Sequence, residues 1–119
     1  MPTSERLSAW DIVVVPFPYS DQLAEKRRPA LIISSGNLSA YRLLWVAMIT
    51  SAANERWTCD VPIENLARAG LPSPSVVRTA KIACIEPDRV LRRAGKLDRN
   101  TAAHVAERLR MFLAGSPQS

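Results

Sequence analysis

The sequence predicts a small, mainly β domain, with a barrel of about five short strands followed by one helix. Short runs rich in β-branched and aromatic residues recur along the chain between turn residues, which is typical of small all-β domains. One stretch near the C-terminus instead places its apolar residues at helical spacing. At 119 residues the chain has the size of a single domain with its own core. We expect one domain over residues 1–119, with its core at about 10–113 and a tail at 114–119.

The five strands are expected where apolar or alternating runs are bounded by proline, glycine or polar turn residues. These runs are residues 10–17, 29–35, 43–51, 57–63 and 75–85, the last of them with a bend. A single helical turn over 64–69 should stop at Gly70. After Pro87, residues 88–93 fit either a short helix or a further strand, and Gly95 is expected to break this segment.

The helix is expected to begin after Asp98, a suitable N-cap, and to run to about Leu113. Its apolar positions fall on one face, which should pack on the barrel: Ala102, Val105, Ala106, Leu109, Phe112 and Leu113.

The charge distribution favours a polyanionic partner. The net charge is +5, and the first 60 residues carry six cations and six anions, so the whole excess lies in residues 61–119. Nucleic acid fits such a basic half better than a membrane does. No apolar run reaches the roughly 18 residues of a spanning helix, and Met1–Ala9 has no apolar signal core. We therefore expect a cytoplasmic protein without membrane contact.

The two cysteines, Cys59 and Cys84, are isolated and have no closely spaced cysteine or histidine. No metal or other cofactor is therefore expected. Both lie in apolar strand-like runs, which predicts buried, reduced thiols.

Three cations, Lys26, Arg27 and Arg28, stand directly before Pro29 and an apolar run. The proline fits the first residue of a strand and holds the preceding arginine in an extended conformation. The planar guanidinium of Arg28 suits phosphate. The alternative is a basic loop end that is only solvated.

Five segments, in this order and at these spacings, resemble the MazF/PemK toxin family over about residues 10–113. They are Trp10–Val13, Arg28–Ile33, Met48–Ser51, Ser75–Arg78 and Ile85–Val90. The resemblance implies a twisted SH3-like barrel with a C-terminal helix, a homodimer, and metal-independent, sequence-selective cleavage of single-stranded RNA. It also implies a cognate antitoxin whose acidic, flexible tail covers the RNA groove.

Residue by residue, the resemblance implies that Arg28 and Thr50 are catalytic and that Arg78 is a second catalytic cation. Two positions depart from the family. Trp10 stands where the family usually has glycine, which should alter only the turn before the first strand. Ala80 stands where some branches have an acidic residue, so no carboxylate base is available there.

Metal-free RNA cleavage uses the neighbouring 2′-OH to attack phosphorus and leaves a 2′,3′-cyclic phosphate and a 5′-OH. Arg28 would stabilise the extra charge on the phosphate oxygens, and Arg78 or Lys81 could share this role. Thr50 would position the phosphate or the 2′-OH, although a strand-end threonine more often bonds its own turn. Asp21 and Glu25 are loop carboxylates that could accept a proton, or are simply solvated.

Further residues are expected to bind RNA. Tyr19 and Trp57 are candidates for stacking on unpaired bases, whereas Trp45 fits the core better. The cations expected to follow the phosphate backbone are Lys26, Arg27, Arg56 and Lys81, and Ser51 adjoins Thr50. The single histidine, His104, falls on the polar side of the expected helix and should be exposed rather than catalytic.

The rival interpretation is a non-catalytic SH3-like module that binds nucleic acid or protein. A gyrase-poisoning toxin of this fold acts through apolar and aromatic residues at its extreme C-terminus, and the ending Gly115–Ser119 disfavours it. Arg28 and Thr50 on opposite faces of the fold would support a binding module. A pocket shared by the two residues would support the ribonuclease.

Overall fold

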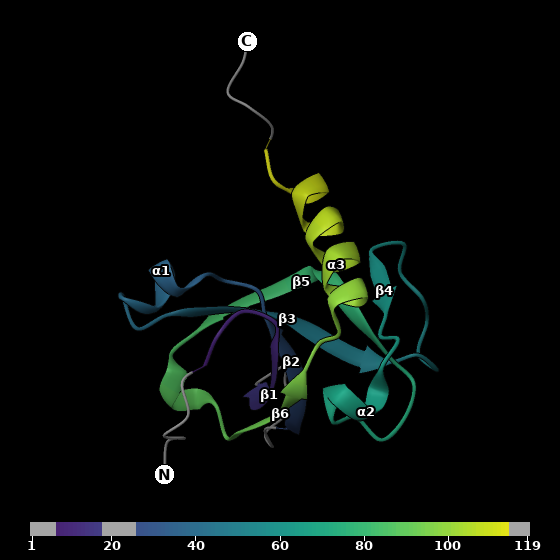
Figure 1. The fold of residues 1–119 in the computed structure, drawn as a ribbon, viewed down its shortest axis with the longest axis horizontal. Helices are drawn as coiled ribbons and strands as arrows, with labels where there is room; N and C mark the ends of the chain where they lie inside the picture. The colour runs from purple at the N-terminus through teal and green to yellow at the C-terminus, as the bar shows by residue number, and fades with distance from the viewer. Residues whose placement is uncertain (1–6, 18–25, 115–119) are drawn as a thin grey trace.

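Six antiparallel strands form one strongly bent sheet in the order β4–β5–β3–β2–β1–β6 (Figure 1). The computed structural model describes residues 7–17 and 26–114. The strands are β1 Asp11–Phe17, β2 Lys26–Ile32, β3 Leu44–Ser51, β4 Asp60–Pro62, β5 Ser75–Ile85 and β6 Arg92–Lys96. The edge strands β4 and β6 do not pair with each other within the described residues, so the sheet is not closed. The mainly β class is confirmed, and β6 adds a sixth strand to the five expected.

The helices are short except for the last. They are α1 Gly36–Ser39, α2 Leu66–Ala69, the 3-10 turn η1 Pro87–Arg89 and α3 Arg99–Phe112. The expected N-cap of α3 is confirmed, because the Asp98 carboxylate accepts the N–H of Thr101 at 2.9 Å. In the described part of the chain, no helix is long and apolar enough to cross a membrane.

Alternating residues of the strands build two buried clusters, one on each face of the sheet. On the face that α3 covers, called here the α3 face, Ile12, Leu31 and Ile49 pack with Ala102 and Val105 of the helix. On the opposite face the cluster consists of Val13, Val15, Ala30, Ile32, Leu44, Val46, Met48 and Val90. Even-numbered residues of β2 and β3 therefore lie on the face opposite α3.

The expected bend in β5 is present as a shift in its pairing with β3. Ala47 pairs with Ile82, whereas the next residue, Met48, pairs with Arg78. Residues 79–81 are thus extra in the ladder, and such an insertion bends a strand. The shift places Arg78 beside Met48, on the face opposite α3.

Trp10 takes the left-handed backbone conformation that the family glycine would adopt without strain. Its φ is 74°, a region that residues with a Cβ rarely enter. The backbone at Trp10 nevertheless keeps two hydrogen bonds, donating to the Ile32 carbonyl at 2.7 Å and accepting from the Leu97 N–H at 2.9 Å. The turn that leads into β1 is therefore tied to both β2 and the end of β6.

Gly95 was expected to interrupt the helix or strand that follows Pro87. That prediction is wrong, because Gly95 lies inside β6. A Cβ at Gly95 would come within 2.4 Å of the Arg68 carbonyl oxygen. The glycine is thus required for the close approach of α2 to β6 rather than for a turn. Gly70 does end α2 as expected, with a left-handed φ of 74°.

The predicted burial of Cys84 and Trp45 is also wrong, although Cys59 is buried as expected. Cys84 is exposed and Trp45 is 45% exposed. Both belong to the α3 face, but α3 packs near β4, and its C-terminal end projects away from the sheet (Figure 1). The helix therefore covers only part of this face, and its own Phe112 and Leu113 are exposed as well.

Candidate active site

Arg28 and Thr50 line one groove at the adjoining ends of β2 and β3. The groove has a volume of about 330 Å³, and its remaining walls are Arg27, Pro29, Ile49, Ser51, Asn54, Leu71, Pro72, Ser73 and Ser75. Ala30 pairs with Met48. Two further residues in the same register bring Arg28 next to Thr50 on the face opposite α3. The sheet thus joins two residues that are distant in the sequence.

The Arg28 guanidinium is partly exposed at the groove. Its backbone is held in the sheet, where Arg28 pairs with Val15 of β1. Among residues 7–17 and 26–114, no carboxylate forms an ion pair with Arg28. Its charge is therefore available to an anion that enters the groove.

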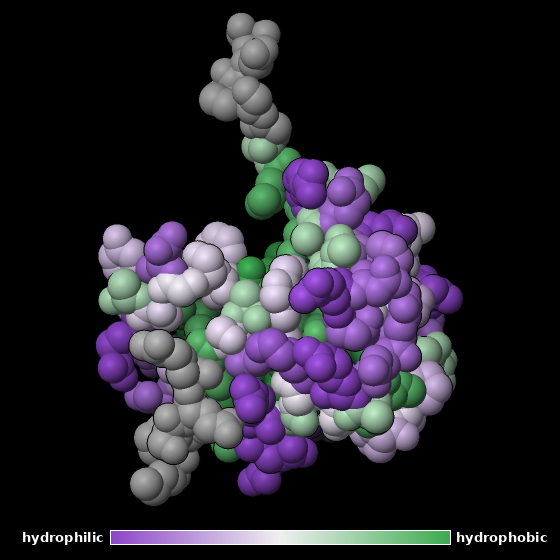
Figure 2. Space-filling view, in the orientation of Figure 1, coloured by the Kyte–Doolittle hydropathy of each residue, from purple (hydrophilic) through white to green (hydrophobic). Residues whose placement is uncertain are grey.

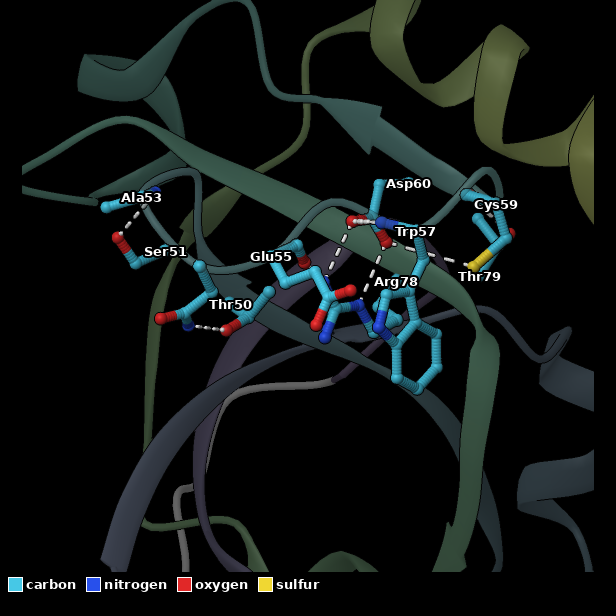
Figure 3. Close-up of polar contacts among 10 residues, drawn as sticks. Thr50, Ser51, Ala53, Glu55, Trp57, Cys59, Asp60, Arg78 and Thr79 are labelled. Carbon is cyan, nitrogen blue, oxygen red and sulfur yellow. Dashed lines mark hydrogen bonds and ion pairs between the residues drawn. The ribbon is translucent and has the colours of Figure 1, made fainter.

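Thr50 is nearly buried, and its hydroxyl is oriented by a residue of the following turn. Asn54 donates from Nδ2 to Thr50 Oγ1 at 2.7 Å (Figure 3). The expected alternative, a hydroxyl that bonds its own turn, is thus partly correct. However, the hydroxyl acts as acceptor in this bond, so its own proton remains for an acceptor other than Asn54.

Asn54 was not among the residues that sequence reasoning selected. The available signal was an amide side chain four residues after a strand-end hydroxyl, within a turn. The turn is further held by Ser51, whose Oγ accepts the Ala53 N–H at 3.1 Å.

Arg78 lies behind this turn in a buried ion pair with Asp60 of β4 (Figure 3). Arg78 Nε donates to Asp60 Oδ1 at 3.0 Å, and Nη2 donates to Oδ2 at 2.9 Å. Such a bidentate interaction fixes the plane of the guanidinium. Arg78 is 8% exposed and Asp60 is 5% exposed. Neither residue lines the groove of Arg28 and Thr50.

The same pair holds the turn that carries Trp57. Arg78 Nη2 also donates to the Glu55 carbonyl at 2.7 Å, and the Trp57 N–H donates to Asp60 Oδ2 at 2.9 Å. The Arg78 guanidinium carbon lies 4.1 Å from the centre of the Trp57 ring, a cation–π contact. Asp60 was missed because its importance depends on the pairing of β4 with β5. The only hint in the sequence was a lone acid in a strand-like run.

The hydrogen bonds to Asp60 alter its pKa. Burial alone raises the pKa of this carboxyl, but the bonds from Arg78 and Trp57, with the charge of Arg78, lower it below its usual 3.8. Hydrogen bonds from Thr101 and Asn65 likewise outweigh burial and lower the pKa of Asp98. Both carboxyls therefore favour the ionised form more in the folded than in the unfolded chain.

Acid should therefore destabilise the protein, and Asp60→Asn should reduce this effect. Above the unfolded-state pKa the stabilising contribution is fully present, and it is lost as the pH falls through the lower folded-state pKa. We expect the free energy of unfolding to be flat near neutral pH and to fall below about pH 5. In urea unfolding across this pH range, the free energy of unfolding of Asp60→Asn should fall less steeply with decreasing pH than that of the wild type. Asp98 should account for part of the pH dependence that is left. An unchanged slope would contradict the assignment.

The other predicted RNA-binding residues are more scattered. Arg27 and Ser51 lie at the groove, Arg56 is exposed on the turn before Trp57, and Lys81 Nζ is 5.9 Å from the centre of the Trp57 ring. Lys26 begins β2. Tyr19, Asp21 and Glu25 lie outside the described residues, and His104 is exposed on α3 as expected.

Known structures of MazF toxins share this fold. The Mycobacterium tuberculosis toxin MazF-mt6 is 25% identical, with a TM-score of 0.67 over 83% of this chain and 91% of that chain. MazF from Deinococcus radiodurans is 20% identical, with a TM-score of 0.69 over 89% and 94%. An endoribonuclease solved with its cognate antitoxin, from a mycobacterial species, is 14% identical, with a TM-score of 0.72 over 96% and 100%.

The sequence pattern of the PemK-like, MazF-like toxins of type II toxin–antitoxin systems matches residues 8–113. The chain therefore belongs to this toxin family, as the resemblance implied. No curated protein matches the chain.

Proposed function

We propose that this toxin is a sequence-selective, metal-independent endoribonuclease that cleaves single-stranded RNA, including mRNA. The observation that supports the proposal most is the groove in which Arg28 and Thr50 meet. Arg28 and Thr50 on opposite faces would have supported a non-catalytic binding module, whereas a shared groove supports the ribonuclease. Family membership and the fold shared with MazF toxins agree with the proposal.

In the proposed reaction the 2′-OH of the RNA attacks the adjacent phosphorus. The bond to the 5′ oxygen breaks, which leaves a 2′,3′-cyclic phosphate on one fragment and a 5′-OH on the other. The 2′-OH gives up its proton, and the leaving 5′ oxygen takes one up. Arg28 stabilises the charge that grows on the non-bridging oxygens.

In this proposal the Thr50 hydroxyl donates a hydrogen bond to a phosphate oxygen and keeps its proton. The bond from Asn54 supports that role, because a hydroxyl that already accepts one hydrogen bond is oriented to donate to another group. Asn54 therefore acts as a positioning residue for Thr50. Arg27 and Ser51 contact the same RNA strand at the groove.

The resemblance implies that Arg78 is a second catalytic cation, but Arg78 does not line the groove, so the role proposed for it is that of a positioning residue. Its ion pair with Asp60 cancels much of its charge and holds it under Trp57. Its contribution to the reaction would then consist of orienting the turn that carries Asn54 and Trp57. The remaining predicted contacts would bind nucleotides that flank the cleaved phosphate. They are Tyr19, Lys26, Arg56, Trp57 and Lys81.

The proposed protein partners are a second copy of the chain and a cognate antitoxin with an acidic, flexible tail. Deinococcus radiodurans MazF has been solved together with MazE. A basic groove that accepts RNA phosphates also suits a chain of carboxylates. Apolar side chains gather in a hollow between α1 and α3 (Figure 2). Trp45 and Ile82 are exposed on the α3 face, which supports the homodimer. The site of action would be the cytoplasm.

The proposal is tested by incubating the purified protein with a long single-stranded RNA in the presence of EDTA. We expect cuts at one short motif, with cyclic phosphate and 5′-OH ends. Total cellular RNA is used as a second substrate, because it contains every short sequence motif. If this RNA also stays intact at excess protein, the result would favour the non-catalytic module instead.

Replacement of Thr50 by valine should lower the rate of cleavage by about ten- to one hundredfold, because a hydrogen bond to a charged phosphate is lost. Valine has nearly the same shape, so the fold should be kept. Asn54→Ala should show a smaller loss in the same kinetic step.

The measurement is single-turnover cleavage at saturating protein, which separates the chemical step from binding. Thr101→Val serves as the control, because it removes a buried hydroxyl at the start of α3 that does not line the groove. It should lower thermal stability without slowing cleavage. A Thr50→Val enzyme with the wild-type rate would remove Thr50 from the site.

A further inference from the structure

Trp57 keeps an open indole surface although one of its faces is covered. Trp57 is 41% exposed, while Arg78, whose guanidinium lies against the Trp57 ring, is only 8% exposed. Arg78 therefore covers part of the indole, and a large part of the residue stays open to solvent. Figure 3 shows the Trp57 ring beside the Arg78 side chain.

The position of this ring is fixed by polar contacts on both sides of Trp57 in the chain. The Trp57 N–H donates to Asp60 Oδ2, and the Trp57 carbonyl accepts the Asp60 N–H at 3.0 Å. Before Trp57, the Glu55 carbonyl accepts from Arg78. An exposed aromatic ring held in this way loses little conformational entropy when something stacks on it.

The surroundings of the ring suit an anionic chain that carries flat bases. Lys81 Nζ also lies over the ring, 5.9 Å from its centre, and Arg56, next to Trp57 in the sequence, is exposed. The same turn leads back through Asn54 to Thr50 in the groove. A strand of RNA in the groove could thus place a neighbouring base on the indole.

We propose that the face of the Trp57 indole that Arg78 does not cover is a stacking site for one unpaired nucleobase of the RNA substrate, and that Asp60 and Arg78 are positioning residues that hold it. This inference rests on the proposed ribonuclease function. Stacking accepts any base, since every base has a π face, but it requires a base that is not already stacked in a duplex. The site would therefore select unpaired RNA and add affinity near the cleaved bond.

The test uses fluorescently labelled single-stranded RNA that contains the cleaved motif, with a 2′-deoxy nucleotide at the cleaved position. Binding is measured for the intact RNA and for RNAs with one abasic nucleotide at each position in turn. For the wild type we expect one position at which loss of the base weakens binding by about five- to one hundredfold.

Trp57→Leu should weaken binding of the intact RNA by a similar factor and abolish the abasic penalty at that position. Trp57→Phe should keep part of the penalty, because a smaller aromatic face remains. Asp60→Asn, measured at a temperature where circular dichroism shows it folded, should reduce the penalty at the same position only. If Asp60 only stabilised the fold, its substitution would not reduce the abasic penalty at one RNA position alone.

Leu91→Ala is the matched control, since Leu91 has a similar exposure of 43% and belongs to no proposed site. It should keep the ratio of intact to abasic binding. A Trp57→Leu protein with the wild-type abasic penalty, or a wild type with no penalty at any position, would overturn the inference.

The two proposals can fail separately. If RNA is cleaved but Trp57→Leu keeps the abasic penalty, the stacking site is wrong and the ribonuclease stands. If no RNA is cleaved, oligoadenylate and oligouridylate replace the motif, each intact or with abasic positions. If an abasic position weakens binding to the wild type but not to Trp57→Leu, the stacking site stands and the ribonuclease is overturned. If no abasic position has such an effect, both proposals are overturned.

Discussion

Arg28→Ala is expected to lower the rate of RNA cleavage by about a thousandfold or more, with the fold intact. A preorganised cation aimed at developing phosphate charge commonly contributes an effect of this size. The Arg28 guanidinium suits this role because it lies in the groove with Thr50 and forms no ion pair with a described carboxylate. Because it is partly exposed, its removal opens no core cavity.

The measurement is the single-turnover rate on one RNA, together with the melting temperature of each protein. Arg28→Lys tests the planar fork, since lysine keeps the charge but cannot bind phosphate through two parallel bonds. Arg110→Ala is the control, because Arg110 is exposed on α3 and pairs there with Glu107. An Arg28→Ala enzyme that cleaves at the wild-type rate would contradict the site assignment.

Asp60→Ala is expected to produce the largest loss of stability, about 3–5 kcal/mol. The substitution leaves the buried Arg78 guanidinium without its carboxylate and the Trp57 N–H without its acceptor. An unpaired buried charge costs more than the intact pair ever contributed. The measurement is urea unfolding at neutral pH.

Two further variants separate this cause from simple loss of packing. Asp60→Leu combined with Arg78→Met should recover part of the lost stability, because no charge is then buried without a partner. Asp88→Ala removes an exposed acid that lies 3.6 Å from Arg42, and it should leave stability nearly unchanged. If Asp60→Ala were as stable as Asp88→Ala, the Asp60–Arg78 pair would not have the proposed importance.

The elements that were predictable from sequence are those determined by local patterns. The strands and α3 follow apolar periodicity, Asp98 is an N-cap of ordinary type, and Gly70 ends a helix in the left-handed conformation. Each of these depends on residues close together in the chain.

The parts that could not be predicted depend on which strands meet and in which register. Asp60 and Arg78 are partners only because β4 pairs with β5. Gly95 looks like a breaker until α2 is seen to approach it. Trp45 has an apolar strand context, but its exposure depends on how far α3 extends over the sheet.

The candidate site is an intermediate case. The selection of Arg28 and Thr50 came from the resemblance, and their separation in the sequence says nothing of their distance. The antiparallel register of β2 with β3 is what brings them together. Asn54 depends on the conformation of a turn, which its sequence does not specify.

The most direct test of the proposed reaction uses one RNA in two forms, which differ only by a 2′-deoxy substitution at the cleaved nucleotide. Both are incubated with the wild-type protein in EDTA. If the 2′-OH is the attacking group, the all-ribose RNA is cut to a cyclic phosphate and a 5′-OH, and the substituted RNA is not cut at that bond. Cleavage of the substituted RNA at the same bond and the same rate would mean that another group attacks the phosphorus, and would contradict the mechanism.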